Sequence, residues 1–381
     1  MRVAFINTLI NPFRIPLMRE VAAMEGLDIT VFHSSSSVYR FWEKGEAGFP
    51  YKVLPGYQLI IKDINGRGKL YFDPTLLLEL FKGKYDVIVV FTWSQPGSVL
   101  AQIISKLTGI PVLLWDDTFR TGVNRSLLPV LGKFIRSYSG YLVGSTRCAD
   151  YYASYGVDRS KMFLFPNVID NARFSAKLDQ SEKRALRIQL GLPESGKVVL
   201  YCGQLVHRKG VMELLEAWKA VCDKGQRDNS YLVFVGKGDL QNDMCEYIQR
   251  HDLMSSILLP GFCQYDELPQ WYAVSDLFVL LSNYDAFPFV INEALSAGLP
   301  VIATETVGAV GDLVKDGVTG LVVPPKDVAA VADALVQLLH DDDKRHSMSE
   351  RARQIMQIWN SDLALSGLRK AIEFVTQESN K

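Results

Sequence analysis

The chain has 381 residues, 48% of them hydrophobic, which is enough to bury the cores of two domains of ordinary size. Its 41 basic and 42 acidic side chains leave a net charge of −1, and this balance excludes a general attraction to nucleic acid or anionic lipid. Five cysteines without a C-x-x-C pair and five scattered histidines without H-E-x-x-H argue against a disulfide framework and a structural zinc site, so we expect a reduced compartment and no dedicated metal.

The first residues, 1–13, predict a strand rather than a targeting segment. A single charge precedes a short apolar stretch that Asn7 and Asn11 interrupt, so no signal peptide is predicted. No run reaches the roughly 18 apolar residues that a membrane span requires. We therefore expect a cytoplasmic protein, and peripheral attachment to the inner face of a membrane stays open.

Apolar runs alternate with helical patterns along the whole chain. Most runs are continuous and rich in Val, Ile and Phe, as in strands of a parallel sheet that are buried on both faces. The first series of predicted strands is Val3–Ile6, Ile29–Phe32, Val87–Phe91, Val112–Trp115 and Tyr141–Val143. The second series is Val198–Cys202, Tyr231–Val235, Ile257–Leu259, Leu277–Leu281, Val301–Ala303 and Gly320–Val322. Helical patterns such as Met212–Val221 and Val328–Leu339 lie between them, which predicts an α/β fold with two doubly wound units.

The two series are separated by a charged stretch, 171–195, that is poor in strand-forming residues. We predict an N-terminal domain over 1–170, a linker over 171–195 and a C-terminal domain over 196–355. The tail, 356–381, alternates apolar and polar positions, which predicts a terminal helix that packs back on the N-terminal domain.

Polar side chains of the first domain follow predicted strands, at the edge where open α/β sheets bind ligands. Asn11 and Arg14 follow the first strand, and Arg14 is a candidate for contacting a phosphate. Asp116 and Asp117 follow the strand Val112–Trp115, and Asp117 is a candidate for binding the hydroxyl groups of a ligand. The structural alternatives are a loop arginine that faces solvent and two acids that cap a turn.

A basic stretch with aromatic neighbours follows in the same domain. It contains Arg120, Arg125, Lys133 and Arg136. This pattern suits a lipid phosphate or a membrane surface, and it equally suits a solvated face.

The second domain has a glycine-rich, basic turn, Gly203–Gly210, between the strand Val198–Cys202 and a helix. Glycines let the backbone approach a ligand closely, and the N–H groups of a helix N-terminus favour an anion. Arg208 and Lys209 add two positive charges at the same place. The turn therefore suits a diphosphate, and a solvated basic turn is the alternative.

Two further segments follow strands of this domain. Val235–Asp239 contains a G-x-G turn, which is weak evidence alone. After the strand that ends at Leu281, Asp285 and Glu293 flank the start of a helix that ends at Gly298. Carboxylates accept several hydroxyl bonds at once, so one suits ribose and the other a sugar. Acids near a helix N-terminus are also favoured without any ligand.

Together these segments resemble the GT-B retaining glycosyltransferases of family four, the glycosyl transferases group 1. The matching segments, in the family's order, are Pro166–Asp170, Gly203–Gly210, Val235–Gly238, Pro260–Phe262 and Asp285–Val301. The resemblance covers nearly all of residues 140–340 and is weaker over 1–120. It implies two Rossmann-like domains that face a central cleft, with the acceptor on the first and the nucleotide-sugar on the second.

The resemblance also implies roles for individual residues. Lys209 is expected to contact the donor diphosphate with help from Arg208, Asp285 to contact the donor sugar, and Glu293 to contact the ribose. The catalytic candidates are Lys209, Arg208, Asp285 and Asp117. The donor-binding candidates are Gly203, Gln204, Gly236, Gly261, Phe262, Phe287, Pro288, Phe289, Val290, Ile291 and Glu293. The candidates for binding acceptor or phosphate are Asn11, Arg14 and Asp116.

The activity implied is transfer of a sugar from a nucleotide-sugar to a saccharide or lipid-linked acceptor, with retention of configuration. A UDP-sugar is the expected donor, and bacterial surface polysaccharide or glycoconjugate synthesis is the expected setting. The donor is a substrate, so no cofactor, metal or nucleic-acid partner is expected, and the oligomeric state stays open.

Three positions depart from the family pattern and keep other functions open. Gln204 replaces an arginine, Asp285 replaces a glutamate, and Pro288 replaces a glycine and removes one backbone N–H. These changes motivate one alternative, a weak or inactive GT-B protein that serves as a binding module. A GT-B sugar-nucleotide epimerase or phosphorylase is the other, although neither an acid and histidine arrangement nor a pyridoxal lysine is evident.

Overall fold

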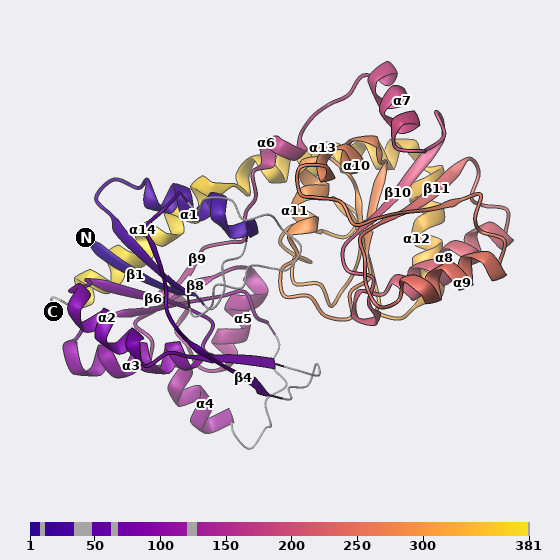
Figure 1. The fold of residues 1–381 in the computed structure, drawn as a ribbon. Coiled ribbons are helices and arrows are strands. Elements are labelled where there is room, and N and C mark those ends of the chain that lie inside the picture. The colour runs from indigo at the N-terminus through magenta and orange to yellow at the C-terminus, as the bar shows by residue number, and fades with distance from the viewer. Residues whose placement is uncertain (8–11, 34–47, 62–67, 120–127, 380–381) are drawn as a thin grey trace. The chain divides into compact units, whose positions relative to one another are not determined.

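The computed structural model describes residues 1–7, 12–33, 48–61, 68–119 and 128–379 (Figure 1). Contacts within the chain divide it into two compact units. The N-terminal unit comprises residues 1–169 and 361–381, and the C-terminal unit comprises residues 170–360. Each unit has its own parallel sheet with helices on both faces.

In the described part of the N-terminal unit, the parallel sheet has seven strands in the order β3-β2-β1-β6-β7-β8-β9. These strands are β1 (Arg2–Asn7), β2 (Asp28–His33), β3 (Tyr51–Val53), β6 (Val87–Phe91), β7 (Val112–Asp116), β8 (Gly140–Val143) and β9 (Met162–Leu164). Phe5 of β1 lies opposite Val31 and Val89 on its two neighbours, and all three are buried. The predicted continuous apolar strands are therefore central strands of the sheet.

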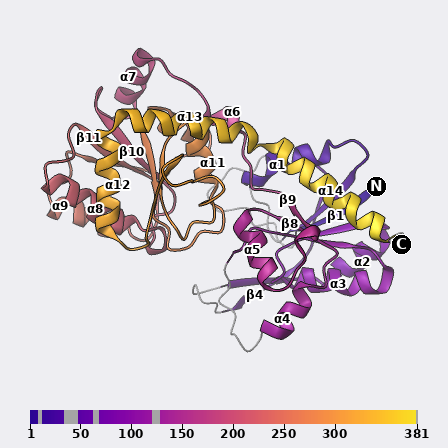
Figure 2. The same cartoon turned by 180° about the vertical axis from the view of Figure 1, so that it is seen from behind.

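Helices cover both faces of this sheet (Figures 1 and 2). The helices are η1 (Pro12–Arg14), α1 (Ile15–Ala22), α2 (Thr75–Gly83), α3 (Pro96–Thr108), α4 (Leu128–Ile135), α5 (Thr146–Ser154), η3 (Arg159–Lys161) and α14 (Ser361–Ser379). Helices α1 and α14 contact each other on one face, and α2 and α3 contact each other on the opposite face. A separate antiparallel hairpin consists of β4 (Tyr57–Ile61) and β5 (Gly68–Phe72).

The C-terminal helix α14 packs on β8 and β9, so its contacts assign it to the N-terminal unit. The approach is close at Gly367, where an added Cβ would lie 1.8 Å from the carbonyl oxygen of Leu164.

Among the described residues, no helix combines the length and apolar character needed to cross a membrane.

The sheet of the C-terminal unit has six parallel strands in the order β12-β11-β10-β13-β14-β15. They are β10 (Lys197–Cys202), β11 (Ser230–Val235), β12 (Ile257–Gly261), β13 (Leu277–Leu280), β14 (Val301–Thr304) and β15 (Gly320–Val323). The order turns back between β10 and β13, so the loops after these two strands flank the switch point where such sheets bind ligands.

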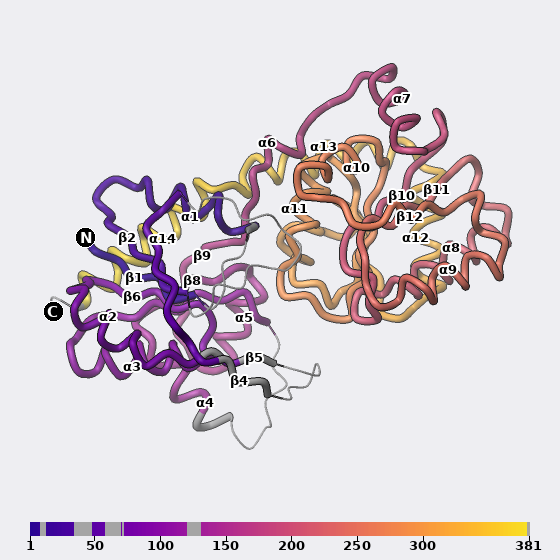
Figure 3. Tube along the Cα trace, viewed as in Figure 1, coloured from indigo at the N-terminus to yellow at the C-terminus, as the bar shows by residue number. Residues whose placement is uncertain are grey.

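The helices of the C-terminal unit also form two layers (Figure 3). They are α6 (Asn171–Phe174), α7 (Gln180–Gln189), η4 (His207–Lys209), α8 (Val211–Asp223), α9 (Gln241–Arg250), α10 (Leu268–Val274), α11 (Phe289–Ser296), α12 (Val328–His340) and α13 (Asp342–Ile358). Helix α8 contacts α9 and α12, whereas α11 contacts α10 and α13. Helix α11, which follows β13 in the chain, thus lies in the same layer as α10 and α13.

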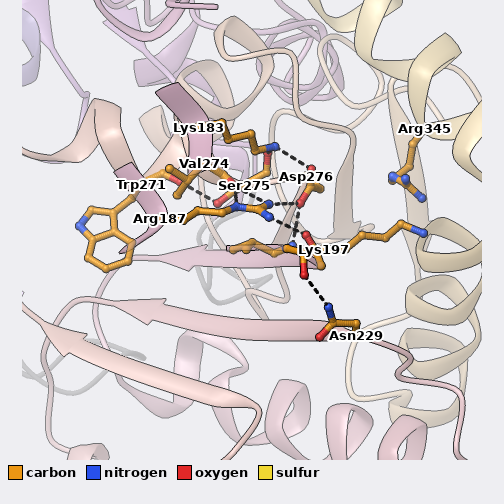
Figure 4. Close-up of polar contacts among 12 residues, drawn as sticks. Lys183, Arg187, Lys197, Asn229, Trp271, Val274, Ser275, Asp276 and Arg345 are labelled. Carbon is orange, nitrogen blue, oxygen red and sulfur yellow. Dashed lines mark hydrogen bonds and ion pairs between the residues drawn. The ribbon is translucent and has the colours of Figure 1, made fainter. Parts of the chain in front are cut away.

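The stretch predicted as a linker, 171–195, is instead part of the C-terminal unit and carries α6 and α7. Its charges have structural partners. Asp179 and Glu182 form a capping box at the start of α7. The buried Arg187 donates to the carboxylate of Asp276 at 2.9 Å and to the carbonyl oxygen of Val274 at 3.0 Å (Figure 4).

We expect Arg187→Ala to destabilise the C-terminal unit by about 3 kcal/mol, because it leaves a partly buried carboxylate without one of its cations. Asp276 keeps Lys183 at 2.8 Å and the N–H of Val198 at 2.7 Å, which limits the loss. Native-state hydrogen exchange of β10 and β13 peptides measures the change. Lys219→Ala, which removes an exposed ion pair with Asp223, is the control and should cost less than about 1 kcal/mol. Equal effects of the two substitutions would contradict the prediction.

Candidate functional site

The loops after β10, β11 and β12 are joined by backbone hydrogen bonds at the carboxyl edge of the C-terminal sheet. The N–H of Gly203 donates to Val235 at 2.9 Å, and the N–H of Gly236 donates to Gly261 at 2.8 Å. A Cβ on Gly236 would lie 1.8 Å from the carbonyl oxygen of Gly203, so only glycine allows this approach. Three of the predicted donor-binding glycines thus converge on one edge.

Lys209 and Asp285 form an ion pair at this edge, although 76 residues separate them in the chain. Lys209 ends η4 just before α8, and Asp285 lies in the loop between β13 and α11. Their side chains are only 13% and 16% exposed. The carboxylate therefore holds the ammonium in place. Because an ammonium has three N–H donors, Lys209 can keep this partner and still contact an anion.

Arg208 lies on the outer side of the same turn. Its guanidinium donates to the carbonyl oxygen of Tyr284 at 2.9 Å and lies 4.0 Å from the carboxylate of Asp285. Its side chain is 43% exposed, so it is far more accessible than Lys209. The side chain of Gln204 is exposed nearby. The backbone carbonyl oxygen of Gln204 accepts a hydrogen bond from the Tyr201 hydroxyl at 2.7 Å.

Glu293 is completely buried in α11. The Tyr272 hydroxyl donates to its Oε2 at 2.6 Å, whereas Oε1 has no hydrogen-bond partner among the described residues. Burial raises the pKa of this carboxyl from 4.5 to about 7, against the opposing effect of the Tyr272 bond. A buried carboxylate oxygen without a donor is costly, and ribose hydroxyls would supply such donors.

The Cys202 thiol at the end of β10 links Glu293 and Lys209 electrostatically. Burial raises the pKa of this thiol well above its ordinary value. The negative charge of Glu293 raises it further, and the positive charge of Lys209 lowers it. Both charged groups therefore influence the thiol at the end of β10.

The N-terminus of α11 is formed without a capping side chain, because Pro288 occupies the cap position. The N–H of Ile291 donates to the carbonyl oxygen of Pro288 at 3.1 Å, so it is already used. The first turn, with Phe289 and Val290, lies at the positive end of the helix dipole, which favours anions. Phe287, just before Pro288, is buried and stacks on Trp359 with ring centroids 5.7 Å apart.

Phe262 follows Gly261 at the end of β12 and is partly buried. The ammonium of Lys237 lies 4.8 Å from the centroid of its ring. This aromatic side chain and its cation lie beside the glycine turn, as suits contact with a nucleotide base.

In the N-terminal unit, Arg14 and Asp117 are also brought together. Arg14 donates to Asp117 at 3.0 Å and to Asn167 at 3.3 Å. Its guanidinium lies over the rings of Phe91 and Trp115, at 4.0 and 4.7 Å from their centroids. Arg14 is only 7% exposed, so it is not the solvent-facing loop arginine that the sequence left open.

Asp116 has a structural place in the turn that follows β7. It is 1% exposed and accepts bonds from the N–H groups of Asp117 at 2.8 Å and Thr118 at 3.0 Å. The Tyr152 hydroxyl donates to its other oxygen at 2.5 Å. Burial raises the pKa of this carboxyl, and the neighbouring Asp117 raises it further. The geometry thus favours the turn-capping alternative for Asp116, while Asp117 remains partly exposed at 16%.

His33 is a residue of this region that the sequence analysis missed. It ends β2, is 2% exposed, and lines a pocket together with Asn7, Arg14 and Trp115. Neither ring nitrogen has a hydrogen-bond partner among the described residues, and burial lowers the pKa of the imidazole to about 4. The sequence signal that could have identified His33 is its position directly after the predicted strand Ile29–Phe32. Asn11, predicted nearby, lies outside the described residues.

Among the described residues, no group of three or more His, Cys, Asp or Glu side chains is arranged to hold a metal ion. Among the predicted site residues, the structure pairs Lys209 with Asp285 and Arg14 with Asp117. Glu293 is buried.

Comparison with known proteins agrees with this architecture. Residues 182–355, within the C-terminal unit, match the family model described as "Glycosyl transferases group 1". Alpha-D-kanosaminyltransferase of Streptomyces kanamyceticus is 33% identical over 46% of this chain and 44% of its own length. The Escherichia coli UDP-Gal:alpha-D-GlcNAc-diphosphoundecaprenol alpha-1,3-galactosyltransferase is 28% identical over 77% of this chain and 75% of its own. The chain spans about half the length of the first curated relatives it matches.

The fold is similar over the whole chain to that of solved structures. Anabaena Alr3699/HepE, crystallised in complex with UDP, superposes with a TM-score of 0.78 over 98% of this chain and 100% of its own, at 19% identity. The two parallel sheets with flanking helices are thus the two Rossmann-like domains of the GT-B fold. The C-terminal unit is thus similar to the group 1 glycosyltransferases over residues 182–355, and the whole chain has the GT-B fold.

Proposed function

We propose that this protein transfers a sugar from a UDP-sugar to a saccharide or lipid-linked acceptor, with retention of the anomeric configuration and without a metal. The observation that carries the proposal is the Lys209–Asp285 ion pair at the edge of the C-terminal sheet, followed along the chain by α11 with its buried Glu293. This edge offers cations and helix amides for a diphosphate and an unpartnered carboxylate oxygen for ribose.

The proposed chemistry follows from where charge develops. When the bond between the sugar and the β-phosphate breaks, negative charge grows on the leaving nucleoside diphosphate. Lys209, Arg208 and the positive N-terminal end of the α11 dipole would stabilise this charge from fixed positions. Asp285 positions the Lys209 ammonium, and it is also the residue proposed to contact the donor sugar.

The acceptor is proposed to bind the N-terminal unit near Arg14, Asp117 and His33. Arg14 is held by two aromatic rings and two polar partners, so it is a fixed rather than a mobile cation. His33 is neutral because of its low pKa, so its ring can both donate and accept a hydroxyl bond. The names of relatives include an enzyme that uses a diphosphoundecaprenol-linked sugar, which supports a lipid-linked acceptor here as a proposal.

Calorimetry on the full chain with UDP, GDP and ADP tests the nucleotide, and UDP should bind tightest. Nuclear magnetic resonance of the sugar released from a panel of UDP-sugars tests the reaction. The first anomer released should keep the configuration of the donor. Tighter binding of GDP or ADP would overturn the base assignment, and an inverted first product would overturn retention. If no nucleotide binds and no sugar is released, the chain is a non-catalytic GT-B binding module.

A further inference from the structure

The outer surface of α2 and α3 in the N-terminal unit exposes large apolar side chains. Leu78, Phe81, Val99, Ile103 and Leu107 are each at least 45% exposed. The three on α3 follow each other at four-residue spacing and so form one stripe along the helix. Single exposed apolar residues are normal, but five on two adjacent helices form a patch that marks an interaction surface.

These five residues lie on one surface of the unit. Helices α2 and α3 contact each other and lie side by side in both views (Figures 1 and 2). Their inner positions, such as Leu76, Leu80 and Ile104, are fully buried against the sheet. The exposed positions therefore point away from the sheet, and nothing in the unit covers them among the described residues.

The charges around the patch are nearly all positive. Lys82 and Lys106 lie on the two helices, and Lys84 follows α2, all exposed. The one acid on these helices, Glu79, is paired with Lys52 at 2.6 Å. Asp86, beyond Lys84, accepts a bond from the N–H of Arg2 at 2.7 Å. A chain whose overall charge is −1 thus has a local surface that is apolar and cationic.

We propose that this α2–α3 face binds the surface of an anionic lipid bilayer. Apolar side chains flanked by lysines are the composition of surfaces that lie in the interface of anionic membranes. A second copy of the chain fits less well, because a two-fold interface would bring the three lysines of each copy against those of the other without acids to pair them. The proposal does not rest on sugar transfer, since lipid binding needs no donor.

The test is co-sedimentation of the full chain with vesicles of phosphatidylcholine containing about a third phosphatidylglycerol. The wild type should bind these vesicles, bind pure phosphatidylcholine much less, and dissociate at high salt. Lys82→Gln combined with Lys106→Gln should lower the partition coefficient roughly 25-fold, because each basic side chain near an anionic bilayer contributes about fivefold. Phe81→Gln combined with Ile103→Gln should lower it at least about tenfold through lost apolar burial.

Matched controls remove the same chemistry from the C-terminal unit. Ile188→Gln with Met254→Gln removes two apolar side chains that are more than half exposed, and Lys224→Gln with Lys315→Gln removes two exposed cations. Both control pairs should bind vesicles like the wild type. Equal losses in controls and test variants would overturn the proposal. A wild type that does not bind anionic vesicles would also overturn the proposal. If that protein is instead a dimer, and Phe81→Gln with Ile103→Gln dissociates it, the face is a dimer interface.

Discussion

Replacing Lys209 by alanine should lower the turnover of the donor about 10²–10³-fold, the usual cost of removing one fixed group that stabilises a developing negative charge. The ammonium is 13% exposed and held by Asp285, so it is a fixed and largely dehydrated cation that water does not replace in the same position. Arg208→Ala should cost less, because that side chain is 43% exposed and more strongly hydrated. The measurement is release of sugar from the best UDP-sugar under saturating conditions.

A structural role for Lys209 predicts a different outcome. If the lysine only neutralised Asp285, then Lys209→Ala combined with Asp285→Asn would restore activity by removing the unpaired carboxylate. Under the proposed mechanism the double variant stays as slow as Lys209→Ala. Lys219→Ala, on the exposed side of α8, controls for loss of positive charge and should keep full activity. Recovery in the double variant would contradict the catalytic assignment.

The sequence predicted the central strands of both sheets because continuous apolar runs identify strands that are buried on both faces. It missed β3 and β9, which form the two edges of the N-terminal sheet. All three residues of β3 are exposed, whereas β9 is apolar but only three residues long and partly buried. It also missed the hairpin of β4 and β5. Strands this short are specified mainly by the strands beside them, which a local pattern does not reveal, whereas the edge strands β12 and β15 were predicted.

The segment 171–195 was misjudged for a related reason. Its charges suggested a solvated linker, but Arg187 is buried and bonded to backbone carbonyls that become adjacent only in the fold. The capping box of α7, Asp179 with Glu182, was the local signal available for a helix.

The candidate site was predictable as a set of loops but not as a set of contacts. Residues that follow parallel strands gather at one edge, so Lys209 and Asp285 could be expected near each other. The pairing of Arg14 with Asp117 joins residues 103 positions apart, and no local sequence pattern predicts it. Asn167 lies in a segment chosen for its resemblance, yet its bonds to Arg14 and Asp117 appear only in the structure.

The second large effect is expected at Glu293, whose ionisation should oppose folding of the ligand-free protein. Its pKa is about 7 in the folded chain and 4.5 as the ordinary value, so the folded state binds more protons between these pH values. Stability therefore falls as pH rises from about 4.5 to 7, by about 3 kcal/mol in total. Glu293→Gln stays neutral and keeps an acceptor for the Tyr272 hydroxyl, so it should be the more stable protein at pH 8 and should lack this slope.

Nucleotide binding should show the opposite preference. Ribose hydroxyls donate to a carboxylate and favour its charged form, so UDP should bind the wild type more tightly as pH rises from about 6 to 8. Glu293→Gln should bind UDP about 1–3 kcal/mol more weakly at pH 8 despite its greater stability. The phosphates of UDP also titrate, but they contribute equally to both proteins, so the difference between them reports Glu293. Urea unfolding and calorimetry at several pH values measure the two effects, with Glu246→Gln, an exposed position, as the control. A variant that is destabilised at pH 8 yet binds UDP like the wild type would make Glu293 a structural residue and leave the ribose without its proposed partner.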